Sequence, residues 1–280
     1  TDLEHDPEAE ARAAIGRALG RLTLGGLPLD DRPGVGVRLD AGRKRLVPDI
    51  DWVEVPAGEC RYGEKNRRIR LPAFHIARYP ITTCQFRCFV DDPQGYADAR
   101  WWEGLAERSE HPAEAAWDYA NHPRETVSWF EAMAFCRWLS ETLGHEVRLP
   151  SEQEWEKAAR GGDGREFPWG EFESGHANID ETWGHDGPHD LGLTSAVGIY
   201  PQGASPFGAL DMAGNIWEWC LNRHDKPSET DPGGDDGRVV RGGSWFRYRG
   251  RARCAYRDGS LPGYRHRYLG FRVLCVSPIF

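Results

Sequence analysis

The sequence has 280 residues, of which 39% are apolar, with 12 Trp, 11 Phe and 9 Tyr. So many large apolar side chains exclude a disordered chain and are enough for one large domain or two small ones. The formal net charge of −9 argues against attraction of the whole surface to nucleic acid. Seven Cys at irregular spacing, without a C-x-x-C pair, argue against both a disulfide framework and a zinc ribbon.

Residues 1–45 differ in composition from the rest. Apolar residues recur at helical spacing between Glu8 and Leu22, which predicts a helix, and the Gly, Pro and Asp between Gly25 and Gly42 are typical of a linker. We expect either a tether from an upstream domain or a helix that packs on the domain that follows. No apolar run is long enough for a membrane span and no signal segment opens the chain, so we expect a cytoplasmic monomer. Removal of a leader peptide stays an open alternative, because the first residue is not Met.

Three helix starts share a hydroxyl N-cap with Glu or Gln three residues later, a pair that satisfies the free amide groups of the first turn. They are Thr82 with Gln85, Ser128 with Glu131, and Ser151 with Glu154. The second helix is expected to end near Gly144. Between Gly161 and Gly208 no period persists, which predicts a long irregular region held by buried aromatic side chains or bound ions.

Several short sequence motifs, most of which contain Trp and which we call words, follow one another in a fixed order. They are 52–58 (WVEVPAG), 127–129 (VSW), 148–155 (RLPSEQEW), 214–219 (GNIWEW), and 241–245 (RGGSW) with 270–272 (GFR). In this order they resemble the formylglycine-generating-enzyme (sulfatase-modifying factor) superfamily. The resemblance covers residues 46–280 and implies an α+β domain with the C-type-lectin-like fold of the formylglycine-generating-enzyme type. Such a domain has few regular elements, long loops, and a C-terminal segment displayed on a small antiparallel sheet.

The branches of this superfamily differ in the chemistry of their C-terminal segment. Its copper oxidases place two Cys after the Gly-Gly-Ser-Trp word, where thiolates bind Cu(I). Here residues 246–252 contain no Cys, and we expect Cys254 and Cys275 to be buried small side chains. In its iron-dependent sulfoxide synthases, the iron ligands come mainly from an additional domain. Here His185 and His189 lie among Gly, Pro and Asp, where the helical i,i+4 geometry that would aim both rings at one ion is not expected. We therefore expect neither copper nor iron and no enzymatic activity, with a metal-dependent oxidoreductase of the same superfamily as the alternative.

A third branch consists of the variable proteins of diversity-generating retroelements, in which adenine-directed mutagenesis rewrites chosen codons near the C-terminus. The segment 241–280 resembles such a variable region, because fixed words alternate with clusters of unrelated residues. The resemblance implies an exposed surface that binds an unknown ligand, for which we expect a protein. The candidate ligand-binding residues are Phe246, Arg247, Tyr248, Gly250, Arg251, Asp258, Gly259, Ser260, Leu261, Gly263, Tyr264, His266, Arg267 and Tyr268.

The composition of these clusters fits adenine-directed change. Randomising both adenines of an AAY codon never yields Trp, Met, Gln, Lys or Glu, and the fourteen positions hold none of the five. The same segment carries nine Arg and a single acidic residue, Asp258. A fixed Arg-rich module that binds anions is an alternative explanation, and internal pairing of these Arg with the acidic body is another.

A surface that accepts many residues cannot depend on those residues for its core. We therefore expect the fixed words to bury Trp245, Cys254, Phe271 and Val273, and the clusters to face solvent.

The words around residue 214 also resemble the segment that holds a structural calcium ion in the copper oxidases. The resemblance implies Asp211 and Glu218 as charged ligands, with Gly214 and Ile216 as carbonyl donors, an oxygen set that suits calcium. The alternative is a pair of carboxylates bonded to loop amides. A second calcium segment resembles residues 178–179, but Gly198 stands where a carboxylate is expected.

Overall fold

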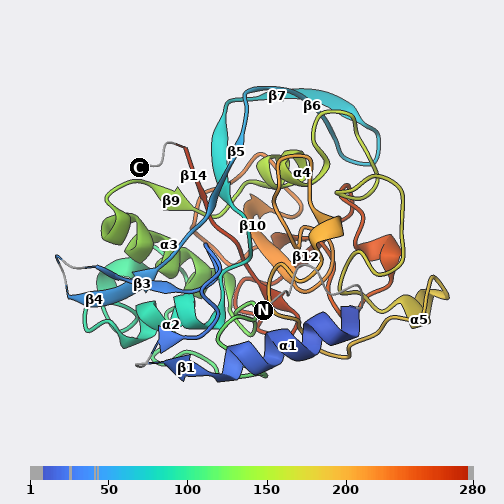
Figure 1. The fold of residues 1–280 in the computed structure, drawn as a ribbon. Coiled ribbons are helices and arrows are strands. Elements are labelled where there is room, and N and C mark those ends of the chain that lie inside the picture. Colours follow the sequence, from blue (N-terminus) through green and yellow to red (C-terminus); the bar gives the residue numbers. More distant parts are fainter. Residues whose placement is uncertain (1–8, 25–26, 41, 43, 277–280) are drawn as a thin grey trace.

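The computed structural model describes residues 9–24, 27–40, 42 and 44–276. Short helices and strands alternate with long loops, as predicted for the α+β class (Figure 1). The helices are α1 (Ala9–Arg21), α2 (Thr83–Asp91), α3 (Trp129–Leu143), α4 (Glu152–Arg160) and α5 (Glu181–Gly184), with single 3-10 turns at Ala99–Trp102, Pro201–Gly203 and Arg249–Arg251. No helix within these residues has the length and apolar character that crossing a membrane requires.

The strands form two four-stranded sheets and three hairpins. One sheet has the order β12-β11-β10-β13 and the other β5-β8-β14-β9, while β1–β2, β3–β4 and β6–β7 pair two by two. The strands are β1 (Thr23–Leu24), β2 (Leu27–Pro28), β3 (Val37–Asp40), β4 (Arg45–Pro48), β5 (Trp52–Val55), β6 (Gly58–Tyr62), β7 (Arg67–Leu71), β8 (Phe74–Ala77), β9 (Val147–Arg148), β10 (Trp217–Arg223), β11 (Arg238–Arg241), β12 (Arg257–Ser260), β13 (Leu269–Gly270) and β14 (Leu274–Cys275). The expectation that the C-terminal sheet is antiparallel is wrong at one edge, where β13 pairs parallel to β10.

The three predicted helix starts are confirmed in full. The hydroxyl groups of Thr82, Ser128 and Ser151 each accept the amide N–H three residues on, and the side chain there accepts the N-cap amide in return. Helix α3 ends at Gly144, whose φ of 78° is the left-handed conformation that glycine adopts without strain.

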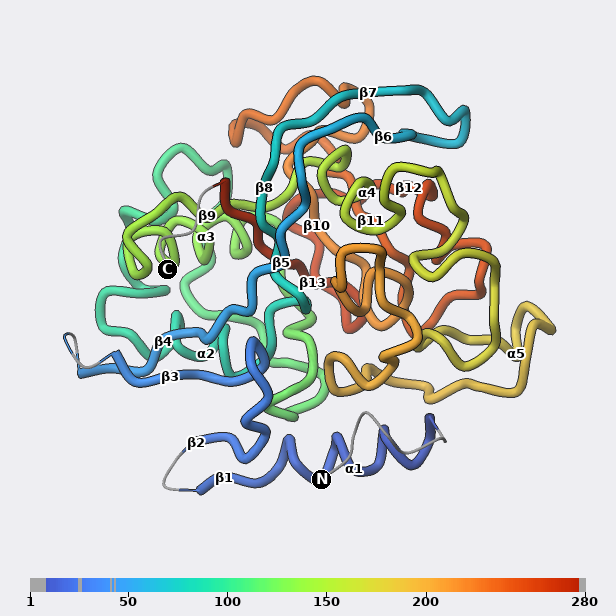
Figure 2. The backbone as a smooth tube through the Cα atoms, turned by 45° about the horizontal axis from the view of Figure 1, so that its top comes forward, coloured from blue at the N-terminus to red at the C-terminus, as the bar shows by residue number. Residues whose placement is uncertain are grey.

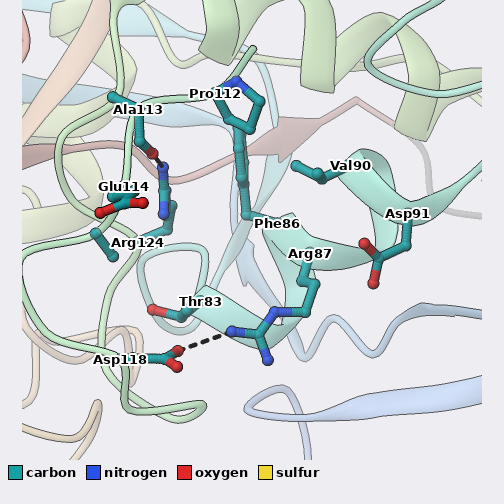
Figure 3. A pocket seen from close by; sticks show the side chains of 11 residues that line it. Thr83, Phe86, Arg87, Val90, Asp91, Pro112, Ala113, Glu114, Asp118 and Arg124 are labelled. Carbon is teal, nitrogen blue, oxygen red and sulfur yellow. Dashed lines mark hydrogen bonds and ion pairs between the residues drawn. The ribbon is translucent and has the colours of Figure 1, made fainter.

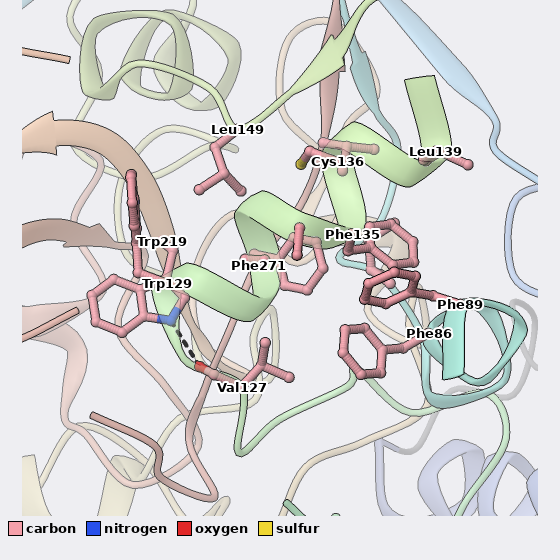
Figure 4. Close-up of a cluster of buried hydrophobic side chains, with 14 of the residues drawn as sticks. Phe86, Phe89, Val127, Trp129, Phe135, Cys136, Leu139, Leu149, Trp219 and Phe271 are labelled. Atoms are coloured by element: carbon pink, nitrogen blue, oxygen red, sulfur yellow. Dashed lines mark hydrogen bonds between the residues drawn. The ribbon is translucent and has the colours of Figure 1, made fainter. Parts of the chain in front are cut away.

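The core lies between these helices and the two sheets (Figure 4). Phe135 of α3 stacks on Phe86 of α2, with ring centroids 5.6 Å apart, and meets Phe271 edge-on at 5.3 Å. Trp129 and Trp219 are fully buried, and each indole N–H donates to a main-chain carbonyl, of Cys220 and of Val127. Phe271 thus anchors the C-terminal segment in the largest aromatic cluster.

The N-terminal helix is confirmed as α1, and it packs on the domain. Gly16 of α1 lies against Ala196, and the Arg12 side chain donates to the carbonyl of Ile199. The stretch predicted as a linker instead contributes the hairpin β3–β4, and Val35 within it is fully buried. Residues 1–8 of the predicted N-terminal segment and residues 277–280 of the predicted variable region lie outside the described residues.

Residues 161–208 are irregular, as predicted, and aromatic side chains hold them. Phe167 lies 5.3 Å from Trp169 and 5.5 Å from Phe172 between ring centroids. In Figure 2 the loop that carries α5 stands at one edge of the molecule, and the β6–β7 hairpin projects from another.

Candidate ligand-binding surface

The predicted division between buried and exposed residues of the C-terminal segment is confirmed. Trp245 is 3% exposed, and Cys254, Phe271 and Val273 are fully buried. All fourteen candidate positions are at least partly exposed, with Phe246 at 41% and Tyr264 at 43%. The segment therefore presents one set of side chains to solvent and anchors itself with the other.

Aromatic rings from three places in the chain meet on this surface. Phe246 lies parallel to Tyr268 at 6.2 Å between ring centroids, and His266 lies 3.8 Å from Tyr268 and 5.9 Å from Tyr264. Trp183 of α5 reaches Phe246 at 6.1 Å and Tyr248 at 5.7 Å. We call these six residues, Trp183, Phe246, Tyr248, Tyr264, His266 and Tyr268, the aromatic surface.

Trp183 was not predicted as part of this surface. It is 51% exposed and lies 63 residues before Phe246 in the chain. Only its presence as a large apolar residue in a polar loop marks it in the sequence. Below the surface, Trp117 meets Trp245 edge-on at 5.5 Å and gives the exposed rings a rigid floor.

The backbone of the candidate positions is held by main-chain groups from outside the clusters. The carbonyl of Arg247 accepts the amide of Asp180 at 3.0 Å, and that of His266 accepts the amide of Thr126 at 3.1 Å. The carbonyl of Tyr268 accepts the amide of Trp217 at 2.8 Å. Such bonds do not depend on side-chain identity, so the backbone path can persist when the exposed side chains change.

Seven of the nine Arg in this segment pair with acidic side chains. They are Arg241, Arg249, Arg251, Arg253, Arg257, Arg265 and Arg272. In the part of the chain that the structure describes, Arg247 and Arg267 form no such pair. Arg247 lies over Phe246 and Tyr268, and Arg267 lies over Trp245 at 5.3 Å from the ring centroid. Internal pairing thus accounts for most of the positive charge, as the second of the two alternative explanations expects.

Two groups of the aromatic surface, His266 and Tyr268, have shifted pKa values. Burial, followed by the nearby Arg267 and Arg247, lowers the pKa of His266. Burial and the hydrogen bond with Tyr264 raise the pKa of Tyr268 to about 12. The surface therefore offers uncharged rings beside the cations of Arg247 and Arg267.

The two carboxylates of the predicted calcium set are bonded within the protein. Glu218 is fully buried, and both its oxygens accept from Arg272, at 2.7 Å from Nη2 and 2.6 Å from Nε. The indole N–H of Trp155 donates to the same carboxylate at 2.7 Å. Asp211 accepts the amide of Gly198 at 2.7 Å. A guanidinium already neutralises Glu218, which agrees with the alternative of carboxylates bonded within the protein, and the calcium set of Asp211, Gly214, Ile216 and Glu218 stays a prediction.

Asp211 makes the stability of the protein depend on pH. Burial raises the pKa of Asp211 to about 6, above its value of 3.8 in an unfolded chain. The folded state therefore binds a proton more tightly, and this group contributes stability that is lost as pH rises from about 4 to about 6. Chemical denaturation at a series of pH values should show wild type gaining stability relative to Asp211→Asn as pH falls through that window. A difference that is constant from pH 7 to pH 4 would contradict it.

The other side chains that could bind a metal ion are those of Cys and His. Burial raises the pKa of every one of the seven Cys, to about 11 for Cys84 and about 12 for Cys275, so they are thiols at pH 7. His189 lies in a partly exposed loop, and its Nδ1 lies 2.7 Å from the Glu10 carboxylate of α1. No group of three or more His, Cys, Asp or Glu suited to a metal ion occurs among the residues described.

Curated relatives correct one expectation. The chain is 32% identical over 290 residues to hercynine oxygenase of Mycolicibacterium smegmatis, which covers 89% of this chain and 64% of that relative. It is 29% identical over 283 residues to the formylglycine-generating enzyme of Thermomonospora curvata, covering 79% and 91%. Both are named as enzymes, so the expectation that this chain is not an enzyme is contradicted. That expectation rested on the missing copper-site Cys pair, which bears on one reaction of the family and not on the others.

The chain spans less than two thirds of the length of that hercynine oxygenase. A solved structure, Treponema denticola variable protein 1, superposes with a TM-score of 0.62 at 22% identity and covers 81% of this chain and 95% of its own. The predicted fold is thereby confirmed. Residues 41–276 match the sulfatase-modifying factor enzyme 1-like domain. The chain belongs to this family of formylglycine-generating-enzyme-like domains.

Proposed function

We propose that the C-terminal segment is a variable ligand-binding surface, of the kind carried by the variable proteins of diversity-generating retroelements. The observation that carries this proposal is the exposure of all fourteen candidate positions above a buried set of fixed side chains. The likeness to Treponema denticola variable protein 1 supports it at the level of the fold.

The glycines of the segment support the proposal independently. A Cβ added at Gly263 would meet only the carboxylate end of Glu107, and one at Gly250 only the ring of Tyr248. A Cβ at Gly270, in contrast, would lie 2.3 Å from the main-chain carbonyl oxygen of Arg124. Larger residues therefore fit at the candidate glycines after a side-chain movement, whereas the fixed glycine is confined by backbone.

The chemistry of the surface favours a protein as ligand. Tyr, Trp and Phe offer large contact areas at low entropic cost, and such residues with Arg are typical of the centres of protein interfaces. The rings of the aromatic surface lie beside Arg247, which is held over Phe246 and Tyr268. A partner that inserts apolar side chains between these rings would bury them further.

The decisive experiment is to sequence the gene and its flanking DNA from many isolates. We expect an adenine-rich near-copy of the 3′ end beside a reverse-transcriptase gene, with differences between isolates confined to the fourteen candidate codons. Codons of the buried set, such as that of Phe271, serve as the internal control and should be invariant. Differences spread evenly over the segment, or no near-copy, would overturn the proposal.

Two glycine substitutions distinguish tolerant from intolerant positions. Gly263→Ala should change the free energy of unfolding by less than about 0.5 kcal/mol. Gly270→Ala should cost about 1–3 kcal/mol, because the added methyl group overpacks against backbone that cannot rotate away. Urea denaturation of the two variants measures both values. Equal losses would contradict the difference between candidate and fixed glycines.

The relatives named as enzymes favour a second candidate function, in which the same surface contacts the substrate of an oxidative reaction. Oxygen consumption and product formation would be measured on the purified chain, with hercynine and iron or with a sulfatase-type Cys peptide and copper. Turnover that disappears in Phe246→Ala would favour this candidate. Turnover that survives would place the reaction elsewhere.

A further inference from the structure

A pocket of about 390 Å³ lies between α2 and the loop of residues 112–118 (Figure 3). Phe86, Val90 and Pro112 give it apolar walls. Arg124 forms part of the wall opposite Val90 and Asp91, and the side chains in Figure 3 face a common space.

Arg124 is a buried cation without an ion-pair partner among the described residues. It is 7% exposed, its guanidinium lies 5.0 Å from the centroid of the Phe86 ring, and its Nη2 donates to the carbonyl of Ala113. Its Nε has no hydrogen-bond partner within the part of the protein described. Burial lowers the pKa of Arg124, although Glu125 and Glu131 oppose this. A buried charge in this state is costly unless something supplies the opposite charge.

The neighbouring buried carboxylates are already used elsewhere. Glu125 accepts the amide of Ala116 and the hydroxyl of Thr126. Glu131 accepts the Tyr96 hydroxyl at 2.7 Å and pairs with Arg265 at 2.8 Å. Neither forms an ion pair with Arg124, although the charges of both favour its protonated state. An anion bound in the pocket would add the direct partner that Arg124 lacks among the described residues.

The rim of the pocket has the opposite sign. Asp91 and Glu114 are exposed and form no ion pair within the described residues, whereas Asp118 is neutralised by Arg87 at 2.7 Å. The pocket thus combines a cation in its wall, an apolar interior and free carboxylates at its mouth.

We propose that this pocket binds an amino acid with an apolar side chain. Its carboxylate would approach the Arg124 guanidinium, which is the charge-assisted pairing that an Arg fork favours. Its ammonium group would lie near Glu114, on the Arg124 side of the pocket in Figure 3, and its side chain would lie against Phe86, Val90 and Pro112. Such a ligand complements all three parts of the pocket at once.

The probes are L-phenylalanine, L-phenylalaninamide, which lacks the carboxylate, and 3-phenylpropionate, which lacks the ammonium group. Calorimetric titration of the full chain should show binding of phenylalanine, and binding of the amide weaker by about tenfold or more. Arg124→Gln should lose phenylalanine binding by a similar factor. Arg137→Gln is the matched control, because Arg137 is also partly buried and donates to the main-chain carbonyls of Trp101 and Glu103, outside the pocket.

A second comparison keeps the proposal open to refutation if Arg124→Gln does not fold. Glu114→Gln, an exposed change, should weaken binding of phenylalanine but not of 3-phenylpropionate. Equal binding of phenylalanine and its amide, unchanged binding in a folded Arg124→Gln, or no binding of any probe to wild type up to about 10 mM would overturn the proposal.

Discussion

Glu218→Gln is expected to lower the free energy of unfolding by about 3–5 kcal/mol, because it leaves the buried guanidinium of Arg272 without a counter-charge. Both side chains are fully buried, and their two hydrogen bonds measure 2.6 and 2.7 Å. Arg272 also donates to the main-chain carbonyls of Ala77 and Leu210, and these carry no net charge to replace the carboxylate. Urea denaturation at pH 7 measures the loss.

The matched control is Glu64→Gln. Glu64 also forms a bidentate pair, accepting from Nη2 and Nη1 of Arg253 at 2.9 and 3.0 Å, but its side chain is 57% exposed. Solvent screens such a pair, so its loss should cost about 1 kcal/mol or less. If both variants lost the same free energy, burial would not be what makes the Glu218–Arg272 pair important.

The features predicted correctly from the sequence are local or repeat within short words. A capping box depends on two residues three positions apart, so Ser128 with Glu131 is enough to place the start of α3. The exposed and buried positions of the C-terminal segment alternate within words whose order resembles a known family. The backbone bonds and ring contacts then follow from that fold.

The features that the sequence does not reveal depend on contacts between distant residues. Glu218 has its partner 54 residues later, at Arg272, and nothing next to Glu218 distinguishes an ion pair from a metal ligand. Val35 looks like a linker residue because Gly and Pro surround it, yet its carbonyl accepts the Thr82 hydroxyl of the α2 N-cap at 2.9 Å. Arg124 likewise lies in a pocket whose other wall belongs to α2.

Trp245→Ala is expected to cost about 3–5 kcal/mol, because it leaves a cavity beneath the aromatic surface. Trp245 is 3% exposed, meets Trp117 edge-on and donates its indole N–H to the carbonyl of Arg267 at 3.3 Å. Removing Tyr248, Tyr264 and Tyr268 together by Ala should cost about 1 kcal/mol or less, because these rings are partly exposed and their backbone is held by main-chain bonds. Thermal and urea unfolding of the two variants measure both losses.

These two variants separate the buried scaffold from the exposed side chains that it carries. The triple variant removes three aromatic rings and the Trp245 variant only one, so a loss that followed the amount of apolar surface would be larger in the triple variant. The division of the segment predicts the opposite order, because only Trp245 fills space that the surrounding side chains cannot close. A triple variant that unfolds at least as easily as Trp245→Ala would mean that the exposed rings stabilise the domain, and a surface of that kind could not accept new residues.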